Sequence, residues 1–266
     1  MTPPAGRDDT TPDASGYTTR SYGDAFAEVY DDWYGPSTTV ASSDLPTTIS
    51  ALAGLANGGP VLELGVGTGR VSIPLAATGL AVHGVDSSQK MLDQLRAKPG
   101  HERVTTSCGD MATDLPPGPF SLVFVAINTF FNLTTLEAQR QCLRTVADRL
   151  SPDGVFVIEA FVPDSSFAGH DLTLRSVQSD GVTLMASLND PVQQTVVGHM
   201  IELRDGMLPR LKPWRVRYAS PDQLDVQAAS CGLHRLERWA DWSRRPFTDS
   251  SSHHVSVYTS RTFRAL

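Results

Sequence analysis

With 266 residues, of which 40% are hydrophobic, the chain is long enough for one large α/β domain, with or without an inserted segment. Its net charge of −7 and the lack of any Lys/Arg run longer than two argue against a nucleic-acid partner, and no stretch reaches the roughly 18 apolar residues of a membrane span. Cys108, Cys142 and Cys231 lie far apart without a CxxC spacing, which predicts reduced thiols and a cytoplasmic location.

The chain opens with a polar segment followed by an aromatic one. Residues 1–20 are rich in Thr, Pro, Asp and Gly and carry no apolar core, so we expect a disordered tail and not a signal peptide. Residues 22–34 have the spacing of a helix with an aromatic stripe that includes Tyr22, Tyr30 and Tyr34. This helix either forms a lid over a ligand or simply buries its aromatic face.

Apolar strands and amphipathic helices alternate regularly through the next hundred residues. The alternation predicts an α/β fold with a doubly wound, mostly parallel sheet. The expected strands are residues 61–64, 81–85, 104–107, 122–127 and 155–161, and the expected helices are residues 45–56, 70–77, 88–98 and 136–150.

The pattern then changes to segments of period two, separated by turn residues. This predicts an antiparallel β insertion after the fifth strand, over residues 164–219, that serves as a cap or as a dimer contact. Ser220 and Gln223 have the spacing of a capping box at the start of a further helix. The expected strands of the insertion are residues 172–177, 182–188, 194–203 and 211–218, and two more strands, residues 233–242 and 255–262, end the chain.

A glycine-rich turn follows the first strand. Gly65, Gly67 and Gly69 are spaced as GxGxG and not as the GxGxxG of dinucleotide enzymes, and Glu63 stands two residues before the first glycine. Asp86 ends the second strand, where a carboxylate can accept hydrogen bonds from both hydroxyls of a ribose. Turn and carboxylate together predict a site for an adenosine-containing cofactor.

The sequence of strand, Glu63, GxGxG turn and Asp86 resembles the class I S-adenosylmethionine-dependent methyltransferases, of the small-molecule type. A Tyr–Asp pair at Tyr30 and Asp31 is similar to that of bacterial amino-sugar N-methyltransferases. The resemblance implies a Rossmann-like domain made of residues 21–163 and 220–266, S-adenosylmethionine as cofactor and S-adenosylhomocysteine as product.

The resemblance also indicates which residues surround the cofactor. The family places an acidic and an apolar group after the third strand, here Asp110 and Met111, and the main chain near the methionine moiety after the fourth strand. The predicted cofactor contacts are Tyr22, Glu63, Gly65, Gly67, Gly69, Asp86, Ser87, Met91, Asp110, Met111 and Ile127.

Three residues are candidates for a catalytic role. Tyr30 could close over cofactor and acceptor, Asn132 could orient the acceptor, and Glu159 could bind an ammonium or act as a base. For each an ordinary structural role is an open alternative: core packing for Tyr30, turn capping for Asn132 and bonds to neighbouring amides for Glu159.

The predicted partner is a small-molecule acceptor, with a homodimer as an option and no nucleic acid, membrane or metal. N-methylation in antibiotic biosynthesis is slightly favoured over O- or C-methylation of an aromatic acceptor; a dehydrogenase is disfavoured, and a binding module without catalysis is the non-enzymatic alternative. We expect His199 to share a face with Ile201 and Leu203 and to line the core more readily than to act in catalysis. The predicted acceptor contacts are Tyr34, Asn128, Phe131, Arg175, His199 and Trp214.

Overall fold

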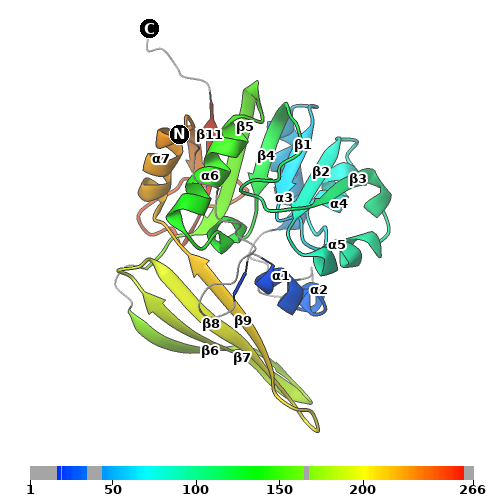
Figure 1. Ribbon diagram of the computed structural model, residues 1–266, viewed down its shortest axis with the longest axis vertical. Coiled ribbons are helices and arrows are strands. Elements are labelled where there is room, and N and C mark those ends of the chain that lie inside the picture. Colours follow the sequence, from blue (N-terminus) through cyan, green and yellow to red (C-terminus); the bar gives the residue numbers. More distant parts are fainter. Residues whose placement is uncertain (1–16, 19, 35–43, 165–167, 261–266) are drawn as a thin grey trace, which may run out of the picture.

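Two β-sheets form the framework of the protein. The computed structural model describes residues 17–18, 20–34, 44–164 and 168–260, so most of the expected N-terminal tail lies outside it. One sheet has seven strands in the order β10-β11-β5-β4-β1-β2-β3, and the other has four in the order β6-β7-β8-β9 (Figure 1). The predicted fold class, a doubly wound sheet with an antiparallel insertion, is confirmed.

The larger sheet has a parallel part and an antiparallel edge. β1 to β5 run parallel, while β11 is antiparallel to both β5 and β10. The strand order reverses beside β1, and ligands of open α/β sheets bind at the carboxyl ends of the strands next to such a reversal. The strands are β1 Val61–Leu64, β2 Val82–Asp86, β3 Val104–Cys108, β4 Phe120–Val125, β5 Leu150–Phe161, β10 His234–Trp239 and β11 His253–Thr259.

Helices cover both faces of this sheet. Helices α3 (Leu45–Ala56) and α4 (Ser72–Ala76) pack on one face, and α6 (Leu136–Ala147) and α7 (Pro221–Ser230) pack on the other. α5 (Gln89–Arg96) packs beside the glycine-rich turn through Leu92 and Leu95, and the short η1 (His101–Arg103) follows it. The central strands β1 and β4 are covered on both faces and are mostly apolar, with Glu63 and Ser121 as their polar residues. None of the described helices has the length and hydropathy needed to cross a membrane.

The smaller sheet extends away from the larger one as a meander (Figure 1). It consists of β6 (Gly169–Gln178), β7 (Gly181–Asp190), β8 (Thr195–Arg204) and β9 (Arg210–Arg217). Two short helices, α1 (Ser21–Phe26) and α2 (Tyr30–Tyr34), lie beside it, and α1 contacts both β9 and α5. The prediction of one helix over residues 22–34 was therefore wrong: the chain turns between the two short helices.

Two predictions from local sequence patterns had different outcomes. The capping box is present, because Ser220 Oγ accepts from Gln223 N and the Gln223 side chain accepts from Ser220 N. The fifth strand was expected over residues 155–161, but β5 begins at Leu150, and Phe120 pairs with Leu150 while Leu122 pairs with Val155. The extra residues are accommodated as a bulge in the strand.

Candidate active site

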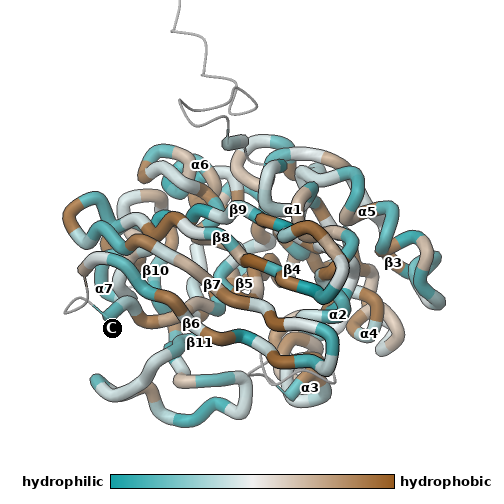
Figure 2. The backbone as a smooth tube through the Cα atoms, turned by 90° about the horizontal axis from the view of Figure 1, so that it is seen from below, coloured by the Kyte–Doolittle hydropathy of each residue, from teal (hydrophilic) through white to brown (hydrophobic). Residues whose placement is uncertain are grey.

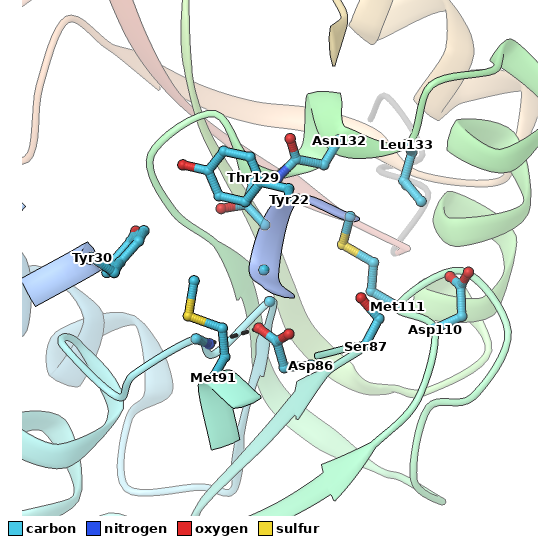
Figure 3. A pocket seen from close by; sticks show the side chains of 13 residues that line it. Tyr22, Tyr30, Asp86, Ser87, Met91, Asp110, Met111, Thr129, Asn132 and Leu133 are labelled. Carbon is cyan, nitrogen blue, oxygen red and sulfur yellow. Dashed lines mark hydrogen bonds between the residues drawn. The ribbon is translucent and has the colours of Figure 1, made fainter. Parts of the chain in front are cut away.

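The glycine-rich turn and Asp86 form a connected unit at the carboxyl ends of β1 and β2. Asp86 Oδ2 accepts a hydrogen bond from Gly67 N at 2.8 Å (Figure 3). Asp86 Oδ1 accepts one from Ser88 N at 2.8 Å. Gly65 and Gly67 have φ values of +69° and +54°, which favour glycine. Burial raises the pKa of Asp86, and the two N–H donors oppose that shift. The carboxylate is thus fixed in position before any ligand binds.

Glu63 and Gly69 lie beneath this turn and do not line the pocket. Glu63 is 4% exposed and accepts a hydrogen bond from the Ser72 hydroxyl. Burial raises its pKa to about 8. At Gly69 an added Cβ would lie 2.8 Å from Leu95 Cγ and 2.9 Å from Ile73 Cδ1, so this glycine allows two helices to approach the turn. Both residues support the turn from the side that faces away from the pocket.

Side chains from four segments surround a small pocket above the turn (Figure 3). Ser87 and Met91 follow β2, and Asp110 and Met111 follow β3, so polar and apolar groups both face the space next to Asp86. Asp110 Oδ1 also accepts from Ala112 N at 2.7 Å, which fixes its orientation. Tyr22 and Tyr30 lie over this pocket from the N-terminal helices.

The N-terminal helices are held against the turn by specific contacts. Ser88 Oγ donates to Asp24 Oδ1 at 2.7 Å, and a Cβ on Gly23 would lie 2.5 Å from Ser88 Cβ. Asp31 accepts from Thr68 Oγ1 at 2.7 Å and forms an ion pair with Lys98 at 2.7 Å. The N-terminal helices therefore cover the pocket and are held in place by these contacts.

A second cavity of about 630 Å³ adjoins this pocket. The two share Tyr22, Tyr30, Thr129 and Asn132, so these side chains stand at the junction. Its remaining wall combines apolar side chains with Glu159, Arg175 and His253. Such a volume suits a small organic molecule. The apolar part of the wall consists of Phe26, Ile127, Phe161, Leu174, Met185, Met200, Trp214 and Val216.

The segment after β4 has an unusual backbone at this junction. Ile127 and Asn128 have φ values of +45° and +63°, a conformation that is costly for a β-branched residue such as Ile. Glu159 Oε2 accepts from Ile127 N at 3.0 Å, and Asn128 Oδ1 accepts from Phe161 N at 2.7 Å. Burial raises the pKa of Glu159, while the Ile127 N–H and the Trp242 indole, which lies outside hydrogen-bonding geometry, favour its charged form. β5 thereby fixes the strained segment that carries Thr129 and Asn132.

Not all predicted acceptor contacts reach the cavity. Phe131 is 0% exposed and belongs to the core between the sheet and α6, so it lines neither cavity. His199 is exposed on the face opposite Met200, because residues alternate along β8 and Met200 points to the acceptor cavity. The expectation that His199 lines the core was wrong. The Tyr34 side chain lies outside the described residues.

Other predicted residues are brought together, some with a changed position. Arg175, Trp214 and Asn128 line the acceptor cavity, and Ile127 lies there and not in the cofactor pocket. Sequence reasoning missed Thr129, Leu133 and His253. Thr129 directly follows strand four and could have been found by position, whereas His253 reaches the site only through the pairing of β11 with β5. Among the described residues, no group of three or more His, Cys, Asp or Glu side chains could hold a metal ion.

Comparisons with known proteins agree with this geometry. Residues 61–154 match a family model described as a methyltransferase domain. The structure of the CcbJ methyltransferase from Streptomyces caelestis is 42% identical, with a TM-score of 0.84 over 91% of this chain and 99% of that chain. A S-adenosylmethionine-dependent methyltransferase from Clostridium acetobutylicum is 16% identical, with a TM-score of 0.75 over 89% of this chain and 98% of that one, and thus shares the fold.

Curated relatives match over a shorter range. The cypemycin N-terminal methyltransferase of a Streptomyces species is 35% identical over 107 residues, which are 40% of this chain and 44% of that protein. The chain spans about half the length of the curated relatives that it matches.

The fold and the fixed carboxylate define a nucleoside-binding α/β protein. The chain belongs to the S-adenosylmethionine-dependent methyltransferases of the small-molecule type, and S-adenosylmethionine is its cofactor. The residues fit this group, since Asp86 is preorganised for a ribose and the positive-φ Gly67 leaves open space above the turn.

Proposed function

We propose that this protein methylates a nitrogen atom of a small organic acceptor. The observation that carries the proposal is the acceptor cavity of about 630 Å³, which meets the cofactor pocket at Tyr22, Tyr30, Thr129 and Asn132. It is mostly apolar, with Glu159 as its carboxylate. An ammonium or amine is the group that a carboxylate in such surroundings binds best.

We assign the cofactor site to Asp86 and to the residues that line the pocket with it. Asp86 holds the ribose hydroxyls, Gly65 and Gly67 give the main chain room, and Met91 and Met111 provide apolar contacts for the adenine. When bound, the cofactor supplies a methyl carbon activated by a positively charged sulfur. The protein positions the acceptor for in-line attack and excludes water, and such positioning can lower the barrier by about 7–11 kcal/mol.

Tyr30 and Asn132 are the side chains that we assign to the surroundings of the reacting nitrogen. Both stand where the two cavities meet: Tyr30 lies on α2, which covers the pocket, and Asn132 lies at the end of η2 (Thr129–Asn132). Arg175 and Trp214, on the insertion, contact the rest of the acceptor. Glu159 both binds the nitrogen and supports the strained Ile127 peptide.

Two further features support a reaction in specialised metabolism inside the cell. One relative, matched over 44% of its length, is named the cypemycin N-terminal methyltransferase. That name supports a nitrogen acceptor and a role in antibiotic biosynthesis. Cys108, Cys142 and Cys231 are free thiols, as expected in the reducing cytoplasm.

Incubation with methyl-labelled cofactor and a matched panel of amines, phenols and indoles tests the proposal by mass spectrometry. We expect label on amines, and Glu159→Leu should abolish it. Label on phenols or indoles alone would replace the nitrogen acceptor with an oxygen or carbon acceptor. S-Adenosylhomocysteine binding, measured by calorimetry, controls for the state of the cofactor pocket.

We also propose that the outer face of the insertion sheet contacts a second copy of the chain. Figure 2 shows hydrophobic positions along these strands, and on the outer face, opposite Met200, all four strands carry exposed apolar residues. Three of the strands have ten residues and β9 has eight. With about 4.8 Å between strands and 3.3 Å per residue, they cover roughly 600 Å², close to the ~800 Å² that each partner of a stable dimer buries. The residues are Leu172, Val177, Leu188, Leu203 and Leu211.

Light scattering coupled to gel filtration tests this contact. Wild-type protein should elute as a dimer and Leu172→Glu as a monomer, with Val226→Glu, at an exposed position of α7, as the control. A monomeric wild-type protein at micromolar concentration would refute the contact.

A further inference from the structure

Another cavity, of about 620 Å³, borders the acceptor cavity at Glu159. This second cavity is formed by the connection between β10 and β11 and by the start of β11, and its wall includes Asp241 and Arg245. Glu159 and His253 are the described residues that line both cavities. They therefore stand at the boundary between the two cavities.

Strand pairing brings these two side chains together. In the β11–β5 register His253 is opposite Phe161 and Val255 is opposite Glu159. His253 and Glu159 thus point to the same face as diagonal neighbours, within about 7–8 Å between main chains. Burial raises the pKa of Glu159, and His253 is one of the groups that oppose this rise, so the two side chains interact electrostatically.

His253 is also in contact with solvent. Its side chain is exposed, and its Nδ1 lies 3.0 Å from Ser252 Oγ. In the tautomer whose Nδ1–H donates to this hydroxyl, Nε2 carries the lone pair that can accept a proton. The neighbouring His254 is buried, and burial lowers its pKa to about 3, so it stays neutral and cannot carry a proton at ordinary pH.

The other charged groups near the two cavities are one ion pair and two arginine side chains. Asp241 is paired with Arg245 on the connection, and Arg175 faces the acceptor cavity from β6. Arg70 acts electrostatically on Glu159 from the glycine-rich turn. Among the described residues, His253 is the imidazole that lines both cavities.

We propose that His253 is a catalytic base that removes a proton from the acceptor ammonium held by Glu159. This inference rests on the proposed N-methylation. An ammonium has no lone pair and cannot attack a methyl carbon. When its proton moves to His253 Nε2, the N–H bond pair remains on nitrogen as the attacking lone pair, and the imidazolium then releases the proton to water through the second cavity.

The pH dependence of His253→Asn against wild type tests this role. Asn keeps a polar atom near Ser252 but cannot take up a proton, and His199→Asn, on the outer face of the insertion sheet, is the matched control. With an amine from the labelled panel, we expect kcat/KM of His253→Asn to fall about 100-fold near neutral pH. The deficit should shrink as the pH approaches the pKa of the free amine, where neutral amine is already present.

A second measurement does not need turnover. Calorimetry with S-adenosylhomocysteine-loaded protein and benzylamine, in two buffers of different ionisation enthalpy, counts the protons released on binding. We expect release from wild type and from His199→Asn and little from His253→Asn.

The outcomes separate the two proposals. A deficit of His253→Asn that is the same at every pH, full activity near neutral pH, or equal proton release from all three proteins would each overturn the role of His253. A wild-type protein that binds S-adenosylhomocysteine but labels no amine would instead refute the proposed function.

Discussion

Replacing Glu63 by Gln should stabilise the protein, and more so as the pH rises. Burial raises the pKa of Glu63 from 4.5 to about 8, so the folded state holds this proton more tightly than the unfolded state does. The stabilising effect of the raised pKa is complete below about pH 4.5 and is lost as the pH rises through about 8. The glutamine side chain is neutral at every pH, and its amide oxygen can still accept from Ser72.

The size of the effect follows from the width of this pH range. Each pH unit above the unfolded pKa removes up to about 1.4 kcal/mol. Near pH 7 the difference between variant and wild type is therefore on the order of 3 kcal/mol, which corresponds to several degrees in the melting temperature of a chain this long.

Thermal or urea unfolding between about pH 5 and pH 8 would measure this difference, with Asp93→Asn, at an exposed carboxylate of α5, as the control. The other buried carboxylates, Asp86 and Glu159, are present in both proteins, so their contributions cancel. A constant difference across the pH range, or a less stable variant at every pH, would refute the reasoning. Because Glu63 lies beneath the turn and not in the pocket, the affinity for S-adenosylhomocysteine should change less than threefold.

Three other substitutions test the cofactor pocket. Asp86→Ala should weaken S-adenosylhomocysteine binding at least about 100-fold in calorimetry, since each lost hydrogen bond to a carboxylate is worth roughly 1.5 kcal/mol or more; unchanged affinity would remove Asp86 from the site. Asp31→Ala should weaken the same binding by up to about tenfold, with less effect at high salt, because it breaks a half-exposed ion pair and one hydrogen bond, whereas the exposed neighbour Asp32→Ala should not. Gly65→Ala should lower the free energy of unfolding by about 2 kcal/mol or more, because a Cβ would lie 2.3 Å from Thr129 Cγ2 at a φ of +69°. Adding Thr129→Ser, which removes that methyl group, should restore part of the loss, and no recovery would place the strain elsewhere.

The parts of the fold that follow from short-range signals could be predicted from the sequence. β1, the glycine-rich turn and Asp86 belong to one strand–helix–strand unit, and the rule for parallel sheets brings the ends of its two strands to one crevice. The capping box at Ser220 needs only residues of a single helical turn. These predictions therefore depended on short stretches of the chain.

Predictions that depended on long-range packing were less complete. Both faces of β8 carry apolar residues, so the sequence could not decide which face is buried: His199 does share a face with Ile201 and Leu203, but that face is the outer one. The N-terminal helix divides because Gly23 must approach Ser88 while Asp31 must reach Thr68. Glu159 was identified as a candidate, but its bond to Ile127 N depends on a backbone conformation that a β-branched residue does not signal.

Lys212 of β9 links the insertion sheet to the first N-terminal helix. It is 7% exposed on the inner face of the insertion sheet, and its Nζ donates to the main-chain oxygen of Ala25 at the end of α1, at 2.8 Å. A bend or rotation of β9 must therefore pull on the helix that carries Tyr22. If a neighbouring subunit sits on the outer face of that strand, a shift of β9 at this contact would reach the helix that covers the nucleoside pocket.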